Sequence, residues 1–398
     1  MKNIFKLSLS QLRDISEDLT AKIATGLIYD NTEIKCIPTF IHPKKEEIKG
    51  NATVLDLGGT NFRAAVVAIS ETAKVLRWAE QNIIEMKSPG FTRNDLFRIQ
   101  ADTLKRVNAP GGPIGYCFSY PAKSLLNGDA ELLTWTKGVQ IQEMISAPVG
   151  RPLLQFLNEQ DKNKYTGIKV LNDTITSLFA GLLFQNYDAY IGIIVGTGTN
   201  MATFYSSENI PKLEMIHNWK GETPVNLESG NFNPPHLTPY DKIVDEQTNN
   251  KGSQRFEKAI SGMYLGTILK AVFPYENLKE NLDASDLTHI INQPADYREN
   301  IVETAWNIYE RSAMLVAASL AGLVKSLYTA NPRIRKVQVL AEGSLFWSRI
   351  TSGRSSYVDI TNETLKEILH DPELPEINVR ISHLENANLI GAAMAVLS

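Results

Sequence analysis

The fold of this chain is decided by an eight-residue stretch that reads Asp56-Leu57-Gly58-Gly59-Thr60-Asn61-Phe62-Arg63. Apolar runs stand on both sides of it, at 52–55 and 64–68. Two strands joined by a Gly-Gly turn predict a β-hairpin, because glycine supplies the positive φ that such a turn requires. We therefore expect a hairpin over these three segments.

The tip of this hairpin carries groups that suit a phosphate. Its backbone N–H groups and the side chains of Thr60 and Asn61 point outward, which is how a loop holds phosphate. Asp56 could hold a hydrated Mg²⁺ ion, and Arg63 could neutralise phosphate charge. On these eight residues alone, a plain hairpin with a charged residue at each end is the alternative interpretation.

A second glycine-rich turn has the same build. Residues 193–202 read Ile-Ile-Val-Gly-Thr-Gly-Thr-Asn-Met-Ala, and both turns contain Gly-Thr-Asn. Two strand–turn–strand units, each opening an α/β stretch, predict a duplicated domain whose hairpins grip one nucleotide from opposite sides of a cleft. Neither turn has the spacing of a P-loop or of a Rossmann fingerprint, so both of those sites are excluded here.

The composition is that of a globular protein with little net charge. The 398 residues predict two or three domains on a length of about 150 residues each. With 43% hydrophobic residues, a net charge of −4 and no basic block longer than Lys44-Lys45, we expect no nucleic-acid or anionic-membrane partner. The two cysteines, Cys36 and Cys117, form no metal spacing or disulfide framework, which fits a reducing compartment.

The chain also shows no targeting signal. Residues 1–7 lack the long apolar core of a signal peptide. No run approaches the roughly 18 apolar residues of a membrane span. We therefore expect a cytoplasmic protein.

The pattern of apolar residues predicts an α/β architecture with mixed sheets. Residues 9–29 are predicted to form an amphipathic helix capped by Ser8 or Ser10. Strands then alternate with helices up to residue 171 and again from residue 189. Later helices are predicted over 253–273, 296–329 and 384–397.

A carboxylate stands where a strand meets a helix. Residues 168–171 are a short apolar strand, 174–183 are typical of a helix, and Asn172-Asp173 lie between them. One interpretation is that Asn172 or Asp173 caps the helix. The other is that Asp173 is a general base that faces a cleft.

Three further segments, 117–121, 132–138 and 226–232, place polar side chains at the ends of apolar strands. Each alone is a turn or a surface strand end, and Glu257 alone is a solvated charge on a helix. Together they supply hydroxyls, amides, carboxylates and one lysine. That set suits a polyol, because each buried partner left unpaired costs about 1–3 kcal/mol.

Eight blocks of this sequence resemble the hexokinases of the eukaryotic type, which include glucokinase. They occur in the order of that family and cover about residues 37–398. The blocks are LDLGGTNFR (55–63), FSYPAKS (118–124), LLTWTKG (132–138), VLNDTITSL (170–178), IVGTGTNMA (194–202), NLESGNF (226–232), FEKAISGMYLG (256–266) and AEGSLFW (341–347).

The resemblance implies a role for each matched residue. Asp173 would take the proton of the sugar 6-hydroxyl, while Lys137 and Arg63 would offset charge on the transferred group. The residues implied to hold the sugar are Ser119, Thr136, Lys137, Asn172, Asp173, Asn226, Glu228 and Glu257. Those implied to hold ATP are Asp56 (also Mg²⁺, through water), Gly58, Gly59, Thr60, Asn61, Arg63, Gly198, Thr199, Gly343 and Ser344.

The resemblance also implies a two-domain, actin-like ATPase fold of the hexokinase type, with duplicated mixed-sheet domains, a cleft and a hinge. The small domain would span 54–172 plus 384–398, and the large domain 1–53 plus 173–383. The implied activity is ATP-dependent phosphorylation of a hexose at the 6-hydroxyl, the first step of glycolysis. D-Glucose is the first candidate, D-mannose and D-fructose are further ones, and the protein would be a monomer or homodimer.

Three positions depart from the family pattern. Glu342 stands where an aspartate is common, and Asn250-Lys251-Gly252 replaces Asn-Pro-Gly, which we expect to loosen a turn before Glu257. Glu310 would place a carboxylate near the ATP phosphates. A non-catalytic hexose-binding sensor of the same fold, or an ATPase without a sugar substrate, are the alternatives.

Overall fold

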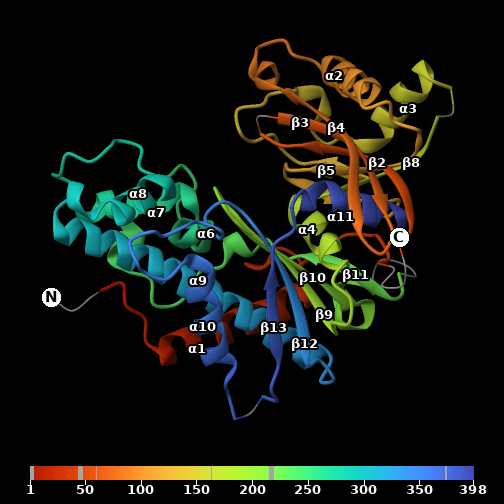
Figure 1. The fold of residues 1–398 in the computed structure, drawn as a ribbon. Coiled ribbons are helices and arrows are strands. Elements are labelled where there is room, and N and C mark those ends of the chain that lie inside the picture. The colour runs from red at the N-terminus through yellow and green to blue at the C-terminus, as the bar shows by residue number, and fades with distance from the viewer. Residues whose placement is uncertain (1–3, 44–47, 60, 163, 215–218, 373) are drawn as a thin grey trace.

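The protein folds into two lobes joined by a pair of crossing helices (Figure 1). A smaller lobe is built on a five-stranded sheet, and a larger lobe on a six-stranded sheet that carries most of the helices. The computed structural model describes residues 4–43, 48–59, 61–162, 164–214, 219–372 and 374–398.

Strands and helices are mixed along the chain. The helices are α1 (Leu9–Ile28), α2 (Arg93–Arg106), α3 (Gly150–Gln160), α4 (Asp173–Gly181), α5 (Pro239–Glu246), α6 (Arg255–Ile260), α7 (Gly262–Val272), α8 (Ala284–Asn292), α9 (Glu299–Ala330), α10 (Tyr357–Leu369) and α11 (Ala387–Leu397). The strands are β1 (Ile37–Pro38), β2 (Gly50–Leu57), β3 (Asn61–Ile69), β4 (Ala73–Asn82), β5 (Gly112–Phe118), β6 (Ala122–Ser124), β7 (Ala130–Leu132), β8 (Tyr165–Leu171), β9 (Ala189–Val195), β10 (Thr199–Ser206), β11 (Glu222–Asn226), β12 (Lys336–Glu342) and β13 (Asn378–Ser382). The strands β2–β4 are consecutive in the small lobe, and the helices α5–α9 are consecutive in the large lobe.

The two sheets have the same topology, which confirms the predicted duplication. The small-lobe sheet runs β4-β3-β2-β5-β8, and the large-lobe sheet runs β11-β10-β9-β12-β13 with β1 added at the β11 edge. In both, the first three strands pair antiparallel and the last two join in parallel. The predicted hairpins are therefore equivalent: the first hairpin is β2–β3 and the second is β9–β10.

The predicted N-terminal helix is present as α1. Ser8 accepts the backbone N–H of Gln11, whose side chain accepts the backbone N–H of Ser8, so a capping box starts the helix. The predicted apolar face of α1 is buried against α9. Its buried side chains include Leu12, Ile15, Leu19, Ile23 and Leu27.

The expectation that no segment approaches the apolar length of a membrane span is wrong for α9. This helix has 32 residues, and one 18-residue window has a mean hydropathy of 1.5, which by length and composition is enough to cross a membrane. Of that window, 72% is buried inside the protein. The apolar character of α9 is accounted for by its position, because α1, α8 and α10 pack around it in the core of the large lobe.

Two helices change places between the lobes. α4 follows β8 of the small lobe but packs on β9 and β12 of the large lobe. α11 follows β13 of the large lobe but packs on β2 and β5 of the small lobe, and α4 and α11 cross each other (Figure 1). The predicted domain boundaries stay a prediction, because the packing of these helices is shared by both lobes.

The crossing brings two backbones into close contact. A Cβ atom at Gly391 of α11 would overlap the carbonyl oxygen of Thr176 on α4. The Thr176 hydroxyl lies 2.6 Å from the carbonyl oxygen of Asp173 and 3.0 Å from Oδ1 of Asn388 on α11. The first turn of α4, where Asp173 stands, is thus held against α11.

We expect Gly391→Ala to destabilise the protein, because the added methyl group must push the two helices apart. An overpacked contact with rigid backbone costs roughly 3 kcal/mol in the free energy of unfolding. Urea unfolding measures this cost. Gly167→Ala is the matched control, since nothing lies within 4 Å of a Cβ atom at Gly167. Equal stability of the two variants would contradict the assigned role of the crossing.

Candidate active site

The first hairpin places an ion pair at the edge of the cleft. Asp56 and Arg63 face each other across β2 and β3. Nε of Arg63 donates to Oδ2 of Asp56 at 3.0 Å, and a second guanidinium N–H donates to the same oxygen. The Asp56 side chain is 7% exposed. Burial acts to lower the pKa of Arg63, but the adjacent Asp56 carboxylate raises it above its ordinary value.

The other predicted residues of this hairpin surround its turn. The Gly58 N–H donates to the carbonyl oxygen of Asn61 at 3.0 Å, and the Asn61 side chain is exposed. Gly59 lies against the side chain of Lys137. Thr60 lies outside the described residues, so its predicted role at the phosphates stays a prediction.

Lys137 reaches from its own loop to the hairpin and to Ser119. Its backbone is left-handed, with φ at 58°, and its Nζ donates to the carbonyl oxygen of Ser119 at 2.8 Å. The same ammonium lies 5.0 Å from the ring centre of Tyr120. The structure therefore places a cation beside two residues that follow β5 at the mouth of the cleft.

The structure confirms the capping interpretation of the strand–helix junction, and the general-base interpretation of Asp173 stays a prediction. Asn172 caps α4 by accepting the Thr174 N–H at 2.9 Å, and Asp173 accepts the same N–H at 2.8 Å. Loss of surrounding water raises the pKa of Asp173 above its ordinary value, although Lys137 and a hydrogen bond with Ser119 oppose this shift. A carboxylate so placed is a stronger base than an ordinary aspartate.

A hollow of about 230 Å³ opens between the lobes, and we call it the cleft hollow. Four of the residues predicted to hold a sugar line it, and they come from four separate places in the chain: Ser119, Asn172, Glu228 and Glu257. Tertiary structure therefore gathers a hydroxyl, an amide and two carboxylates around one space, which is the donor and acceptor set that a polyol requires.

The acidic wall of the cleft hollow is held by hydrogen bonds. Asn200 donates to Asn226 at 2.7 Å, and Asn226 donates to Glu228 at 2.8 Å. Glu257 accepts the Thr199 N–H at 3.0 Å. Burial raises the pKa of Glu228 and the pKa of Glu257, which these hydrogen bonds partly counter. The network fixes both carboxylates in position before any ligand arrives.

The remaining predicted sugar contacts lie beside the cleft hollow. Asn226 lines a neighbouring space of about 40 Å³ together with Asn172 and Glu228. Thr136 and Lys137 are exposed and do not line the cleft hollow. Sequence reasoning missed four polar lining residues, Lys35, Asn200, Asn231 and Gln254. Two of these residues carried a signal in the sequence. Asn200 belongs to the repeated Gly-Thr-Asn tripeptide, and Gln254 is three residues before Glu257.

A larger hollow of about 950 Å³ lies at the tip of the second hairpin, and we call it the hairpin hollow. Gly196 and Thr197 line it from the turn, and the predicted Ser344 lines it from the segment after β12. Gly343 is left-handed, with φ at 111°, and a Cβ atom there would overlap the carbonyl oxygen of Val195. Only glycine lets these two segments meet.

Two residues assigned to the nucleotide lie elsewhere. Thr199 lines the cleft hollow, and Gly198 lies against the Glu257 carboxylate. The second hairpin thus joins the two hollows, since its turn faces one and its second strand faces the other. Polar residues of the hairpin hollow that sequence reasoning missed are Thr197, Gln247, Thr248, Tyr264, Thr267, Lys270, Glu280, Asn281, Asp283 and Ser285.

The structure corrects two expectations about departures from the family pattern. Glu310 does not line the hairpin hollow; burial raises its pKa, while Lys6 and Arg354 act against this. The turn at 250–252 is not loosened, because the Gly252 N–H donates to Asp245 at 2.9 Å.

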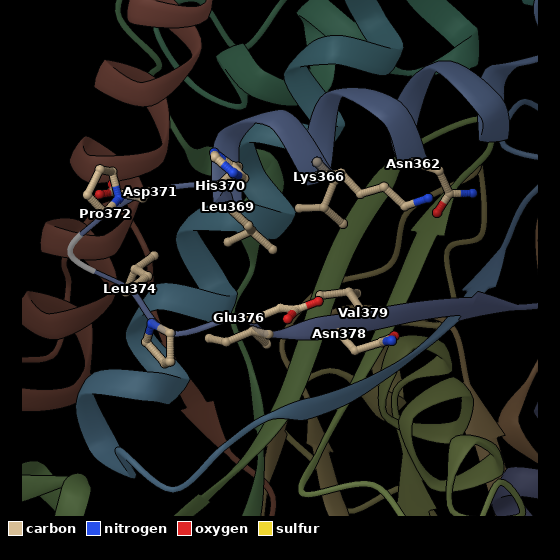
Figure 2. A pocket seen from close by; sticks show the side chains of 13 residues that line it. Asn362, Lys366, Leu369, His370, Asp371, Pro372, Leu374, Glu376, Asn378 and Val379 are labelled. Carbon is tan, nitrogen blue, oxygen red and sulfur yellow. The ribbon is translucent and has the colours of Figure 1, made fainter.

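A further hollow of about 660 Å³ lies between α10 and β13 (Figure 2). Its lining includes Lys366, His370 and Glu376 beside apolar side chains. It contains none of the predicted site residues. The candidate active site is therefore the cleft hollow together with the hairpin hollow.

The donor set suits a metal that arrives with its ligand. Over the described part of the chain, no three His, Cys, Asp or Glu side chains gather to hold a metal ion on their own. Mg²⁺ keeps several waters and is bound through one or two carboxylates plus substrate phosphates. The nearly buried carboxylate of Asp56 at the phosphate-type hairpin fits that kind of site.

Duplicated sheets, two facing hairpins and an aspartate at a helix start define a sugar kinase of the actin-like ATPase fold. Solved structures agree with this fold. A Schistosoma mansoni hexokinase complexed with glucose matches with a TM-score of 0.76 at 24% identity, over 99% of this chain and 96% of that one. Another hexokinase crystal structure matches with a TM-score of 0.83 at 22% identity, over 99% and 97%.

The chain belongs to the hexokinase family. Two family models described as hexokinase match residues 1–182 and residues 190–275 with 274–398. Hexokinase-1 of Arabidopsis thaliana is 28% identical over 98% of this chain and 88% of its own length. Hexokinase-3 of rice (Oryza sativa subsp. japonica) is 28% identical over 97% and 86%. The chain is thus an enzyme for ATP-dependent hexose phosphorylation.

We expect Gly343→Ala to weaken nucleotide binding, because the methyl group must displace the turn that lines the hairpin hollow. A loss of about 2 kcal/mol corresponds to roughly thirtyfold weaker binding of ADP. Titration calorimetry measures it. Gly353→Ala is the matched control, because Gly353 also has a positive φ of 82° but has open space around it. An equal effect in both variants would assign the loss to backbone strain alone.

Proposed function

We propose that this protein transfers the γ-phosphoryl group of Mg-ATP to the 6-hydroxyl of D-glucose, with D-mannose and D-fructose as further substrates. The reaction is the first step of glycolysis, and we place it in the cytoplasm with a monomer or homodimer as the working unit. The observation that carries the proposal is the Asp173 carboxylate, which interacts with Ser119 of the cleft-hollow lining and is acted on by the charges of Lys137 and Asp56, although Asp173 is not itself among the residues that line the hollow.

The cleft hollow is the proposed sugar site. Glu228 and Glu257 are held in place as acceptors for sugar hydroxyls, while Ser119 and Asn172 supply a hydroxyl and an amide. A sugar that lacks one of the matching hydroxyls would leave a dehydrated carboxylate unpaired. Such a penalty is the physical source of discrimination among hexoses.

Asp173 is the proposed general base. Its pKa is raised because burial removes surrounding water, and the deprotonated carboxylate is the form that would accept the proton of the sugar hydroxyl. Phosphoryl transfer has a loose transition state, so the enzyme mainly positions groups and offsets charge. Lys137 lies close enough to influence Asp173 and would stabilise negative charge in the transition state.

The two hairpins are the proposed site for ATP. The hairpin hollow would take the nucleoside beside Ser344, and the first hairpin would face the phosphates with Asp56 and Arg63. Mg²⁺, held by Asp56 through water, would supply charge neutralisation to the phosphates. Water competes with the sugar hydroxyl, so we expect the lobes to close on the sugar before transfer, with a hinge near 51–54 and 171–174.

We expect Asp173→Ala and Asp173→Asn to lower kcat for glucose phosphorylation by about 10²–10⁴-fold, the range for loss of a general base. Sugar 6-phosphate formation from Mg-ATP and each of the three hexoses measures the activity. Titration calorimetry with glucose checks that binding is kept.

The same assay decides between the proposal and its alternatives. Parent protein that binds glucose but forms no sugar 6-phosphate would place the chain among hexose-binding sensors. ATP hydrolysis that is faster without sugar than transfer to sugar would indicate an ATPase. Unchanged kcat in both Asp173 variants would remove that residue from the chemistry.

The pH dependence of kcat follows from the charges around Asp173. The deprotonated form is active, so kcat should fall as the pH drops through the pKa of Asp173, which lies above the ordinary value of about 3.9. Lys137 lowers that pKa, so Lys137→Met should move the acidic limb to higher pH. The ionisation of ATP is the same in every sample, so it cannot shift the acidic limb of one variant relative to another. Lys123→Met is the control, because Lys123 is an exposed lysine on β6, and it should leave the acidic limb in place. A shift of the limb to lower pH in Lys137→Met would contradict the assignment of Lys137 as the cation that lowers the pKa of Asp173.

A further inference from the structure

Glu342 holds a carboxylate oxygen without a partner. The residue ends β12 of the large lobe and is partly buried. Its Oε1 atom is buried and has no hydrogen-bond partner among the described residues. A buried acceptor left unsatisfied is unfavourable, and more so when it is charged. The structure therefore contains an acceptor that lacks a donor in this arrangement of the lobes.

The cation that acts on Glu342 belongs to the other lobe. Loss of surrounding water raises the pKa of Glu342 to about 7, and Arg63 of β3 opposes this shift. In the large-lobe sheet Glu342 is in register with Ile194, which is two residues before the turn of the second hairpin. Glu342 thus lies beside the second hairpin and is acted on by the charge of a residue of the first hairpin.

Arg63 has donors to spare. Both of its hydrogen bonds to Asp56 go to the same oxygen, Oδ2, whereas a guanidinium carries five N–H donors. Its side chain is 30% exposed, compared with 7% for Asp56. Because the guanidinium is partly exposed to solvent, it can turn toward a second carboxylate without leaving a fully buried position.

A metal–nucleotide complex would disturb this ion pair. Under the function proposed above, Asp56 holds the hydrated Mg²⁺ of ATP. Two cations would then compete for one carboxylate, and like charges so close together repel. The guanidinium, which faces the phosphates in the proposed function, still has N–H donors left for a second carboxylate, and Glu342 has an oxygen without a partner.

We propose that Arg63 exchanges carboxylates when Mg-nucleotide binds: it leaves Asp56 and pairs with Glu342, which frees Asp56 and ties the first hairpin to the second. The inference rests on the proposed function, because it takes Asp56 as the residue that faces Mg²⁺. Glu342 is a positioning residue in this scheme, since it acts through Arg63. The exchange makes closure of the lobes dependent on the metal-bound form of the nucleotide.

The length of the side chain matters to this scheme. Glu342 is one methylene longer than aspartate, so it reaches further from the end of β12 toward the opposite lobe. Glu342→Asp keeps the charge and shortens the reach, while Glu342→Gln keeps the size and removes the charge. The pair of variants separates an ionic role from a packing role.

The test is the affinity for ADP with and without Mg²⁺, measured by titration calorimetry in the presence of glucose. In the parent protein we expect Mg-ADP to bind more tightly than metal-free ADP. Glu342→Gln should reduce that ratio by about tenfold, the equivalent of roughly 1.4 kcal/mol for a lost ion pair. Glu342→Asp should retain part of the preference.

Two controls accompany the titrations. Glu310→Gln removes a partly buried carboxylate that does not line the hairpin hollow, and it should leave the ratio unchanged. Thermal unfolding and glucose affinity without nucleotide show whether each variant is folded. If Glu342→Gln makes the protein unfold, the Glu342→Asp variant is used for the test instead. Its preference for Mg-ADP over metal-free ADP should then be lower than that of the parent protein.

Small-angle X-ray scattering adds a readout of closure. With glucose and Mg-ADP, the parent protein should have a smaller radius of gyration than the Glu342→Gln variant. An unchanged Mg-ADP to ADP ratio in folded Glu342→Gln protein overturns the exchange, and so does an equal loss in Glu310→Gln. Neither readout needs turnover, so a failure of phosphoryl transfer in the parent protein is recognised separately.

Discussion

The crossing of α4 and α11 is the contact on which the rest of the structure depends. Each helix leaves the sheet of one lobe and packs on the sheet of the other, and both contribute to the buried cluster that contacts both sheets. Gly391 lets the two backbones approach closely at Thr176. Because Asp173 is the first residue of α4, the packing that joins the lobes also sets the position of the proposed base.

The cleft that this crossing creates is a site of dehydrated carboxylates. Burial raises the pKa of Asp173, Glu228, Glu257 and Glu342 alike, each at the end of a strand or the start of a helix. One cation acts against the shift at each of them: Lys137, Lys35, Lys258 and Arg63 in turn. A site of this kind favours ligands that bring hydroxyl donors, as a sugar does.

Local sequence predicted the hairpins and the α1 helix because those features depend on neighbours in the chain. Glycine at a turn and apolar residues at helical spacing act over a few residues. The expectation about Glu310 was wrong because its surroundings come from Lys6 and Arg354, far away in the chain. The expectation about apolar segments was wrong for α9 already at the level of composition, and what the tertiary structure adds is that α1, α8 and α10 bury its apolar residues.

The sequence by itself determined the two glycine hairpins, the mixed α/β pattern, the family and most of the residue types that line the cleft. Only the tertiary structure decided which of these residues meet. In the folded chain, one hollow is lined by Ser119, Asn172, Glu228 and Glu257. Thr199 lines the same hollow, whereas the sequence had assigned it to the nucleotide. Glu342 lies where the charge of Arg63 acts on it. The physical reason is that turns and periodicity are local, whereas burial, ion pairing and pKa depend on segments distant in sequence.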